Sequence, residues 1–240
     1  MSFDIGSEAD RSLLSGLKNL KLGALMELIA VLLVIISLVV LFFSIPSPTP
    51  MSPYPPTGMM NLALLLPAML LVLVALVLVL VSYIIIFKAT GDLKRYSPSR
   101  LGIGRTGMIL QLLGLILIFL CVIAMVPTFA AIGPNIGINE VFTVLGAIAI
   151  LVVIAVVLLI VGSILFGVMV MRLSEVEGLD PGFKTAGILY IASVILSIIP
   201  VISVIGGILA LVSMILIYIY SNSSIKRLES YGMGPATFSS

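Results

Sequence analysis

The sequence predicts an all-α integral membrane protein with six transmembrane helices. Three observations support this fold class: 61% of the 240 residues are hydrophobic and only 9% are charged, apolar runs of membrane-crossing length recur along the chain, and the basic residues lie between alternate runs. Because lipid satisfies no backbone hydrogen bonds, the spans should be helices packed as a bundle. The shortage of charge leaves no sizeable soluble domain between them.

The apolar run at 185–222 is too long for one crossing. About 20 residues cross roughly 30 Å of hydrocarbon at 1.5 Å per residue, so a single straight helix would overshoot by nearly a factor of two. Pro200 removes a backbone donor, and Gly206 and Gly207 adopt turn dihedrals at little cost. We therefore predict a helical hairpin that reverses near 200–207.

The other apolar runs lie at 23–45, 59–87, 106–131 and 141–171, which brings the total to six spans. All 12 basic residues then fall on one side of the membrane: Arg11, Lys18, Lys21, Lys88, Lys94, Arg95, Arg100, Arg105, Arg172, Lys184, Lys226 and Arg227. Because short cytoplasmic loops hold the basic excess of membrane proteins, both termini should be cytoplasmic. The net charge of +2 therefore reflects topology and does not indicate a nucleic-acid partner.

This topology divides the chain into three parts. Residues 1–22 are predicted to form a cytoplasmic amphipathic lead-in at the lipid headgroups, because Leu13, Leu14, Leu17 and Leu20 recur at helical spacing beside basic residues. Residues 23–222 form the six-helix membrane domain. Residues 223–240 form a cytoplasmic tail.

The residue inventory excludes several chemistries. The chain contains no His, no Trp and a single cysteine, Cys121, which lies inside the third span. Imidazole metal sites, haem ligation by His, Ser-His or Cys-His catalysis and intrachain disulfides are therefore absent. We predict no cofactor and no metal site.

A weak threefold repeat relates the odd-numbered spans. Lys21, Arg105 and Lys184 each open one of these spans, and the most polar position of each span follows six residues later, at Glu27, Gln111 and Tyr190. The repeat predicts three tandem hairpins of the same orientation around an axis along the membrane normal. Glu27, Gln111 and Tyr190 would then lie at one depth and could face that axis.

Two interpretations of Glu27 remain open. A carboxylate inside a span is costly when unpaired, so it is a functional-site hypothesis by default. Alternatively, Glu27 lies close enough to the interface to reach lipid headgroups or one of the cations Lys21, Arg95 and Arg105, and we favour this simpler interpretation.

The loop at 88–105 concentrates basic residues. Lys88, Lys94, Arg95, Arg100 and Arg105 accompany a single acid, Asp92. At roughly 1 kcal/mol per basic residue near an anionic leaflet, this loop could bind lipid headgroups or an acidic partner. Topology alone would also explain the charge.

Small residues four positions apart mark faces where helix backbones can approach closely. The pairs are Ser163 with Gly167, Ser193 with Ser197, Ser203 with Gly207, and Gly206 with Ala210.

The chain resembles archaeal multi-pass proteins of unknown function. The resemblance rests on a Leu-rich basic lead (SLLSGLKNLKLGALMELIAVLL), a glycine-marked span start (LGIGRTGMILQLLG) and a closing hairpin followed by IKRL. The chain is most similar to the DUF973 group, and DUF996 is the second choice. This resemblance implies about six spans in an archaeal cell membrane, and it brings no catalytic residue.

Three hypotheses for the function follow. The favoured one is a non-enzymatic accessory or assembly component of a cell membrane, which packs against protein partners or as a homo-oligomer. The alternative is a small permease or channel with a polar path near Glu27, Gln111 and Tyr190 that opens to the cytoplasm. A membrane enzyme would need clustered acids or an activated nucleophile, and the acid cluster Glu175, Glu177 and Asp180 is better explained as a solvated loop.

Overall fold

The structure of the protein, a computed structural model, describes residues 8–44, 62–131 and 138–230. Within these ranges the chain is helical and forms no strand. The elements in order are α1 (Glu8–Ser44), α2 (Leu62–Tyr96), α3 (Pro98–Ala131), α4 (Ile138–Leu173), α5 (Phe183–Ser197), the 3₁₀ helix η1 (Pro200–Ile202) and α6 (Ser203–Leu228). The predicted all-α architecture is confirmed.

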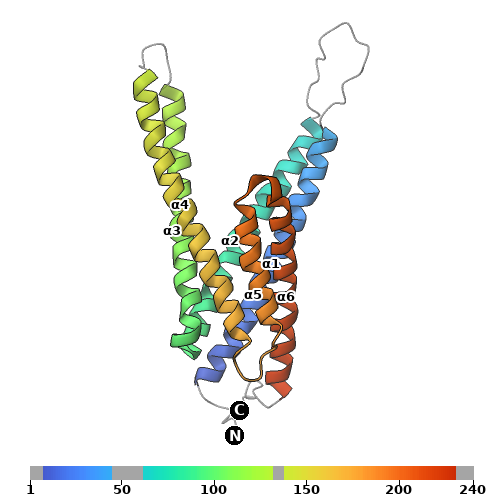
Figure 1. Ribbon diagram of the computed structural model, residues 1–240. Helices are drawn as coiled ribbons and strands as arrows, with labels where there is room; N and C mark the ends of the chain where they lie inside the picture. Colours follow the sequence, from blue (N-terminus) through green and yellow to red (C-terminus); the bar gives the residue numbers. More distant parts are fainter. Residues whose placement is uncertain (1–7, 45–61, 132–137, 231–240) are drawn as a thin grey trace, which may run out of the picture.

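The six helices form three hairpins that close into a ring (Figure 1). Within the hairpins, α1 packs against α2, α3 against α4, and α5 against α6. Between hairpins, α2 contacts α3, α4 contacts α5, and α6 returns to α1. This closed order is the arrangement expected of three tandem hairpins with the same orientation.

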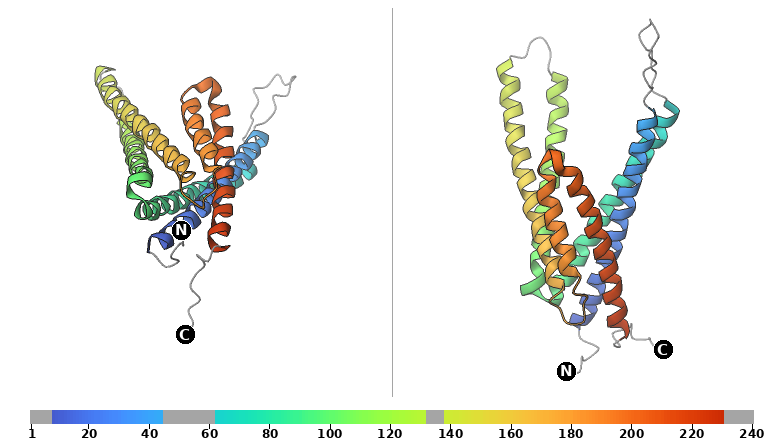
Figure 2. Two further views of the ribbon diagram at one scale, coloured as in Figure 1. Left: turned by 60° about the horizontal axis from the view of Figure 1, so that its bottom comes forward. Right: turned by 45° about the vertical axis from the view of Figure 1, so that its right-hand side comes forward.

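The hydrophobic core lies at the end of the bundle where α1 begins and α6 ends (Figure 1). On α1 it buries Leu13, Leu17, Leu20 and Ala24, which follow one another at helical spacing. Further along the same stripe, Ile35 and Leu38 are exposed. Figure 2 shows why: the α1/α2 and α3/α4 hairpins diverge toward their far ends. Side chains on their facing sides therefore have no protein neighbour there.

Five helices are long and apolar enough to cross a membrane: α1, α2, α3, α4 and α6. The sixth, α5, has 15 residues and rises about 22 Å, which is shorter than a full crossing. The reversal of the third hairpin accordingly lies short of the ends of the other two (Figure 1). The turn occurs at η1, where Pro200 starts a 3₁₀ helix.

The predicted role of Gly206 and Gly207 in this turn is wrong. Both glycines lie in the first turns of α6. A Cβ on Gly206 would come 2.5 Å from the Ser197 hydroxyl and 2.9 Å from the Ser193 carbonyl oxygen. Gly206 therefore lets α6 pack closely against α5. Proline and the preceding extended residue, Ile199, are enough to turn the chain.

The two ends of the membrane domain also differ from the predicted boundaries. Residues 8–21 continue directly into α1, and their leucines pack into the protein core. They therefore do not form a separate helix at the headgroups. At the other end, α6 continues past 222 to Leu228. Both differences have the same reason. At this end of the ring the helices pack against one another, so their apolar side chains are buried in the protein core and not against lipid headgroups.

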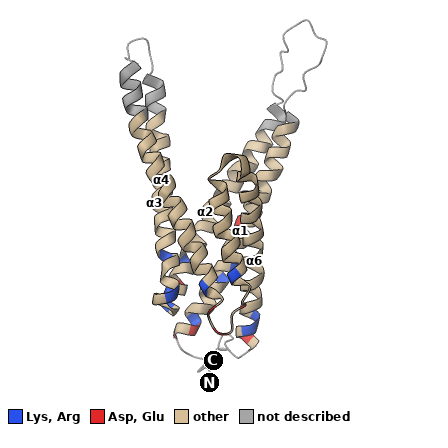
Figure 3. Ribbon diagram, viewed as in Figure 1, with Lys and Arg blue, Asp and Glu red and all other residues tan. Residues whose placement is uncertain are grey.

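In the described residues, most charged side chains belong to the end of the bundle where α1 begins and α6 ends (Figure 3). The connections at the opposite ends of the first two hairpins, 45–61 and 132–137, are outside the described residues. From the positive-inside rule we expect the charged end to face the cytoplasm.

A cysteine-accessibility experiment tests this orientation. In a Cys121→Ser background, we expect Ser99→Cys, exposed at the start of α3, to react with a membrane-impermeant maleimide only after the cells are permeabilised. Equal labelling in intact cells would reverse the topology.

The three hairpins cross at equivalent positions. Two residues beyond Lys21 and Lys184, the carbonyl oxygens of Gly23 and Ala186 each accept a hydrogen bond from a serine hydroxyl of the partner helix, Ser82 at 2.9 Å and Ser213 at 2.8 Å. Two residues beyond Arg105, Gly107 instead meets Gly162 at close range. A close contact at the equivalent position of each hairpin, a serine hydrogen bond in two of them and a glycine pair in the third, supports the predicted repeat.

Candidate intramembrane polar site

Gln111 and Ser163 join α3 to α4 just above the crossing point of their hairpin. The Gln111 side-chain amide donates to the Ser163 hydroxyl over 3.0 Å, and Gln111 is buried. The close approach depends on Gly162, because a Cβ there would come 2.7 Å from Cγ of Gln111. The glycine thus places an amide side chain against the opposite helix.

Tyr190 reaches this pair from α5. Its ring packs edge-on against Phe166, with 5.2 Å between ring centroids, and passes over Gly167, where a Cβ would come 3.2 Å from the ring. Its hydroxyl lies beside the side chains of Ser163 and Gln111. Of the three predicted site residues, the structure therefore brings Gln111 and Tyr190 into one network.

Glu27 and Tyr83 complete the group from the first hairpin. Both lie close enough to Tyr190 to interact with it electrostatically. The Tyr83 hydroxyl donates to the backbone carbonyl oxygen of Met108 at 2.9 Å, which links α2 to α3. We name Glu27, Tyr83, Gln111, Ser163 and Tyr190 the central polar site; five of the six helices contribute to it.

The ion pairs that the simpler interpretation gave Glu27 are not formed. Lys21 donates to Asn222 at 2.8 Å and lies over the ring of Tyr218. Arg105 donates to the backbone oxygen of Phe87. Within the described residues, Glu27 has neither a hydrogen bond nor an ion pair. Its side chain is half-buried and lies close enough to Tyr190 to interact with it electrostatically.

The central polar site lies where the packed core ends and the hairpins begin to diverge. On α3, Leu101 and Met108 below Gln111 are buried, whereas Leu115 and Val122 above it are about half exposed, at 47% and 54%. The packed core lies between the site and the charged end of the bundle.

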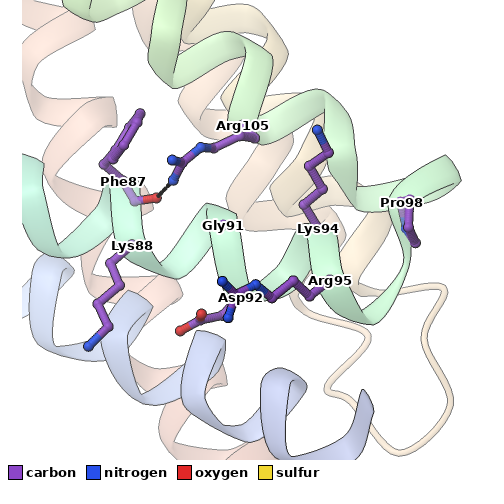
Figure 4. A pocket seen from close by; sticks show the side chains of 8 residues that line it. All are labelled: Phe87, Lys88, Gly91, Asp92, Lys94, Arg95, Pro98 and Arg105. Carbon is purple, nitrogen blue, oxygen red and sulfur yellow. Dashed lines mark hydrogen bonds between the residues drawn. The ribbon is translucent and has the colours of Figure 1, made fainter. Parts of the chain in front are cut away.

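The basic residues of the 88–105 loop divide into two groups. Lys88, Lys94, Arg95 and Arg105 line a pocket of about 630 Å³ between α2 and α3 (Figure 4). Arg100 lies outside it, and its backbone oxygen accepts a hydrogen bond from Arg172 at 3.2 Å.

The acid cluster has a structural explanation at Asp180. Its carboxylate accepts hydrogen bonds from the Gly182 backbone and the Ser223 hydroxyl and forms an ion pair with Arg227 at 3.4 Å. These contacts fasten the α4–α5 loop to α6. Among the described residues, no three His, Cys, Asp or Glu side chains group closely enough to bind a metal ion.

Sequence reasoning missed Ser163 and Tyr83 as members of the polar site. Ser163 carried a signal, since it was identified as a small packing residue, but its hydroxyl also serves as the hydrogen-bond partner of Gln111. Tyr83 carried none, because a single tyrosine in an apolar run does not show which way it faces.

Five membrane-length apolar helices in three hairpins, with the charges at one end, define a multi-pass membrane protein. Residues 14–238 match the family described as protein of unknown function (DUF973), and the chain belongs to this family. Comparisons with curated proteins and with solved structures give no match.

Proposed function

We propose that the protein is a small permease or channel, without enzymatic activity, in which the central polar site binds a cation during passage. The observation that carries this proposal is the convergence of Glu27, Gln111 and Tyr190 from three different hairpins at one level of the membrane domain. A carboxylate without a charged partner inside a span is costly and is usually kept for function. Its negative charge selects a cation, and the simplest candidate is the proton.

The side chains of the central polar site would have different roles in binding a cation. Glu27 supplies the charge, and the neutral groups of Gln111, Ser163 and Tyr190 supply hydrogen bonds to a bound ion or its water. Beyond the site, side chains such as Leu115 and Val122 are exposed, whereas on the charged side Leu20, Met108 and Ile217 are buried. Passage then requires the hairpins to rock about the crossing points of the ring.

Proton flux into proteoliposomes tests the proposal. With a potassium diffusion potential and an enclosed pH-sensitive dye, we expect the protein to accelerate acidification above that of empty liposomes. Glu27→Gln removes the charge at nearly constant shape and should return the rate to that background. Glu175→Gln is the matched control, because this exposed loop carboxylate should leave the rate unchanged. Wild-type flux equal to that of empty liposomes would refute a proton path.

A second candidate function is an accessory or assembly component of an archaeal cell membrane. It is favoured by the exposed apolar side chains on the facing sides of the diverging hairpins, such as Ile35 and Leu38. Another membrane protein, or a second copy of this chain, could fill that space. A stoichiometric second chain recovered from native membranes in mild detergent would favour this function.

A further inference from the structure

The pocket between α2 and α3 is lined by Phe87, Lys88, Gly91, Asp92, Lys94, Arg95, Pro98 and Arg105 (Figure 4). We name it the basic pocket. It contains four cationic side chains and one carboxylate, so its net charge is positive. It opens at the cytoplasmic end of the apolar part of α2, where lipid headgroups would lie.

Two of its charges are already engaged by the protein. Arg105 is anchored by its hydrogen bond to the Phe87 carbonyl oxygen and by its position 3.5 Å from the Phe87 ring centroid. The Asp92 carboxylate accepts hydrogen bonds from Ser15 at 2.9 Å and from Asn19 at 3.1 Å, both on α1. Asp92 is therefore held toward the first helix, and the pocket keeps a net positive charge because its four cations outnumber this one carboxylate.

The other three cations are available to a ligand. Lys88, Lys94 and Arg95 are exposed, and none forms an ion pair or hydrogen bond within the part of the chain that the structure describes. The corresponding junction between α6 and α1 differs, because Lys21, the repeat partner of Arg105, donates to Asn222 there. At the α2/α3 junction, by contrast, several cations without a partner in the described residues line one pocket.

The surroundings of the pocket suit a lipid better than a soluble anion. One turn above Lys88 on α2 lies Ile84, which is 68% exposed, and one turn above Arg105 on α3 lies Ile109, which is 43% exposed. Residues four apart share a helix face. A ligand with its phosphate among the cations would therefore have its acyl chains over exposed isoleucines.

We propose that the basic pocket binds the phosphate-bearing headgroup of an anionic phospholipid from the cytoplasmic leaflet. Arg105 supplies a fixed guanidinium, and Lys88, Lys94 and Arg95 close around the headgroup. The lipid would bridge α2 and α3, and thereby join the first hairpin to the second.

Native mass spectrometry of the full-length protein in detergent tests the proposal. The probes are phosphatidylglycerol and phosphatidylcholine with identical acyl chains. We expect phosphatidylglycerol to bind more tightly, and the double variant Lys94→Gln/Arg95→Gln to weaken it about tenfold or more, given the contribution of each basic residue near an anionic headgroup. The control Lys184→Gln/Lys226→Gln removes the same charge from exposed positions at the same end of the bundle and should change binding less than about twofold.

Three results would overturn the proposal. An equal loss of phosphatidylglycerol affinity in the two double variants would show that basic residues anywhere at this end of the bundle can bind the lipid. Equal binding of the two lipids would show that the negative charge is irrelevant. Displacement of phosphatidylglycerol by excess inorganic phosphate would assign the pocket to a soluble phosphate compound. A size-exclusion profile identical to that of the wild type establishes that each variant is folded.

Discussion

Replacing Gly107 with valine should abolish or severely reduce the recovery of folded protein. Even a Cβ at this position would come 2.6 Å from the Gly162 carbonyl oxygen and 3.0 Å from the Phe166 backbone nitrogen. Because both atoms belong to the backbone of α4, no rotamer change can relieve the clash, and α3 and α4 must separate. Overpacking of this kind costs about 3 kcal/mol or more. The measurement is the yield of monodisperse protein and its thermal unfolding temperature in detergent.

Gly146 provides the matched control within the same hairpin. It lies on α4, and a Cβ there would have nothing within 4 Å. Gly146→Val should therefore change stability by about 0.5 kcal/mol or less. If Gly107→Val behaved like Gly146→Val, the crossing of α3 and α4 described above would be wrong.

The close contact between Gly107 and Gly162 also explains why the central polar site depends on the packing of α3 against α4. The Gln111–Ser163 hydrogen bond of 3.0 Å forms only if the two helices approach to the distance that Gly107 and Gly162 allow. A side chain that separates the helices would also disconnect Gln111 from Tyr190. Loss of the crossing and loss of the site are therefore expected together.

Features encoded along one stretch of chain could be predicted from the sequence. Apolar length and alternating charge predicted the three hairpins, Pro200 predicted the last reversal, and the spacing from Lys21, Arg105 and Lys184 selected the polar positions. These signals are local, because bilayer thickness and charge placement act on each span separately.

Features that depend on contacts between helices could not be predicted. Gly206 and Gly207 look equivalent in the sequence, yet Gly206 packs against α5 and Gly207 has nothing within 4 Å. Similarly, the leucines of residues 8–21 could bind headgroups or a protein core equally well, and only the closure of the ring selects the core. An amphipathic stripe shows that a face is buried without showing which partner covers it.

Glu27→Leu should make the protein more stable while abolishing any proton flux. The carboxylate lies in a span, and in the described structure it has no hydrogen bond or ion pair to compensate its burial. An acid at the centre of a membrane helix costs about 2.5–3.5 kcal/mol relative to water, and Glu27 lies nearer the interface, so a gain of about 1–2 kcal/mol is expected. Thermal unfolding in detergent measures the gain, and the proteoliposome assay measures the loss.

Gln111→Leu should have the opposite effect on stability. It removes the hydrogen bond to Ser163 and leaves that hydroxyl and Tyr190 without their amide partner, which costs about 0.6–1.5 kcal/mol. The two substitutions therefore distinguish a structural residue from a functional one. Replacing a residue that holds the fold together lowers the stability of the protein, whereas replacing an unpaired charge that serves binding does not. If Glu27→Leu lowered the unfolding temperature as Gln111→Leu does, Glu27 would be a structural residue and the cation path would lose its only charged group.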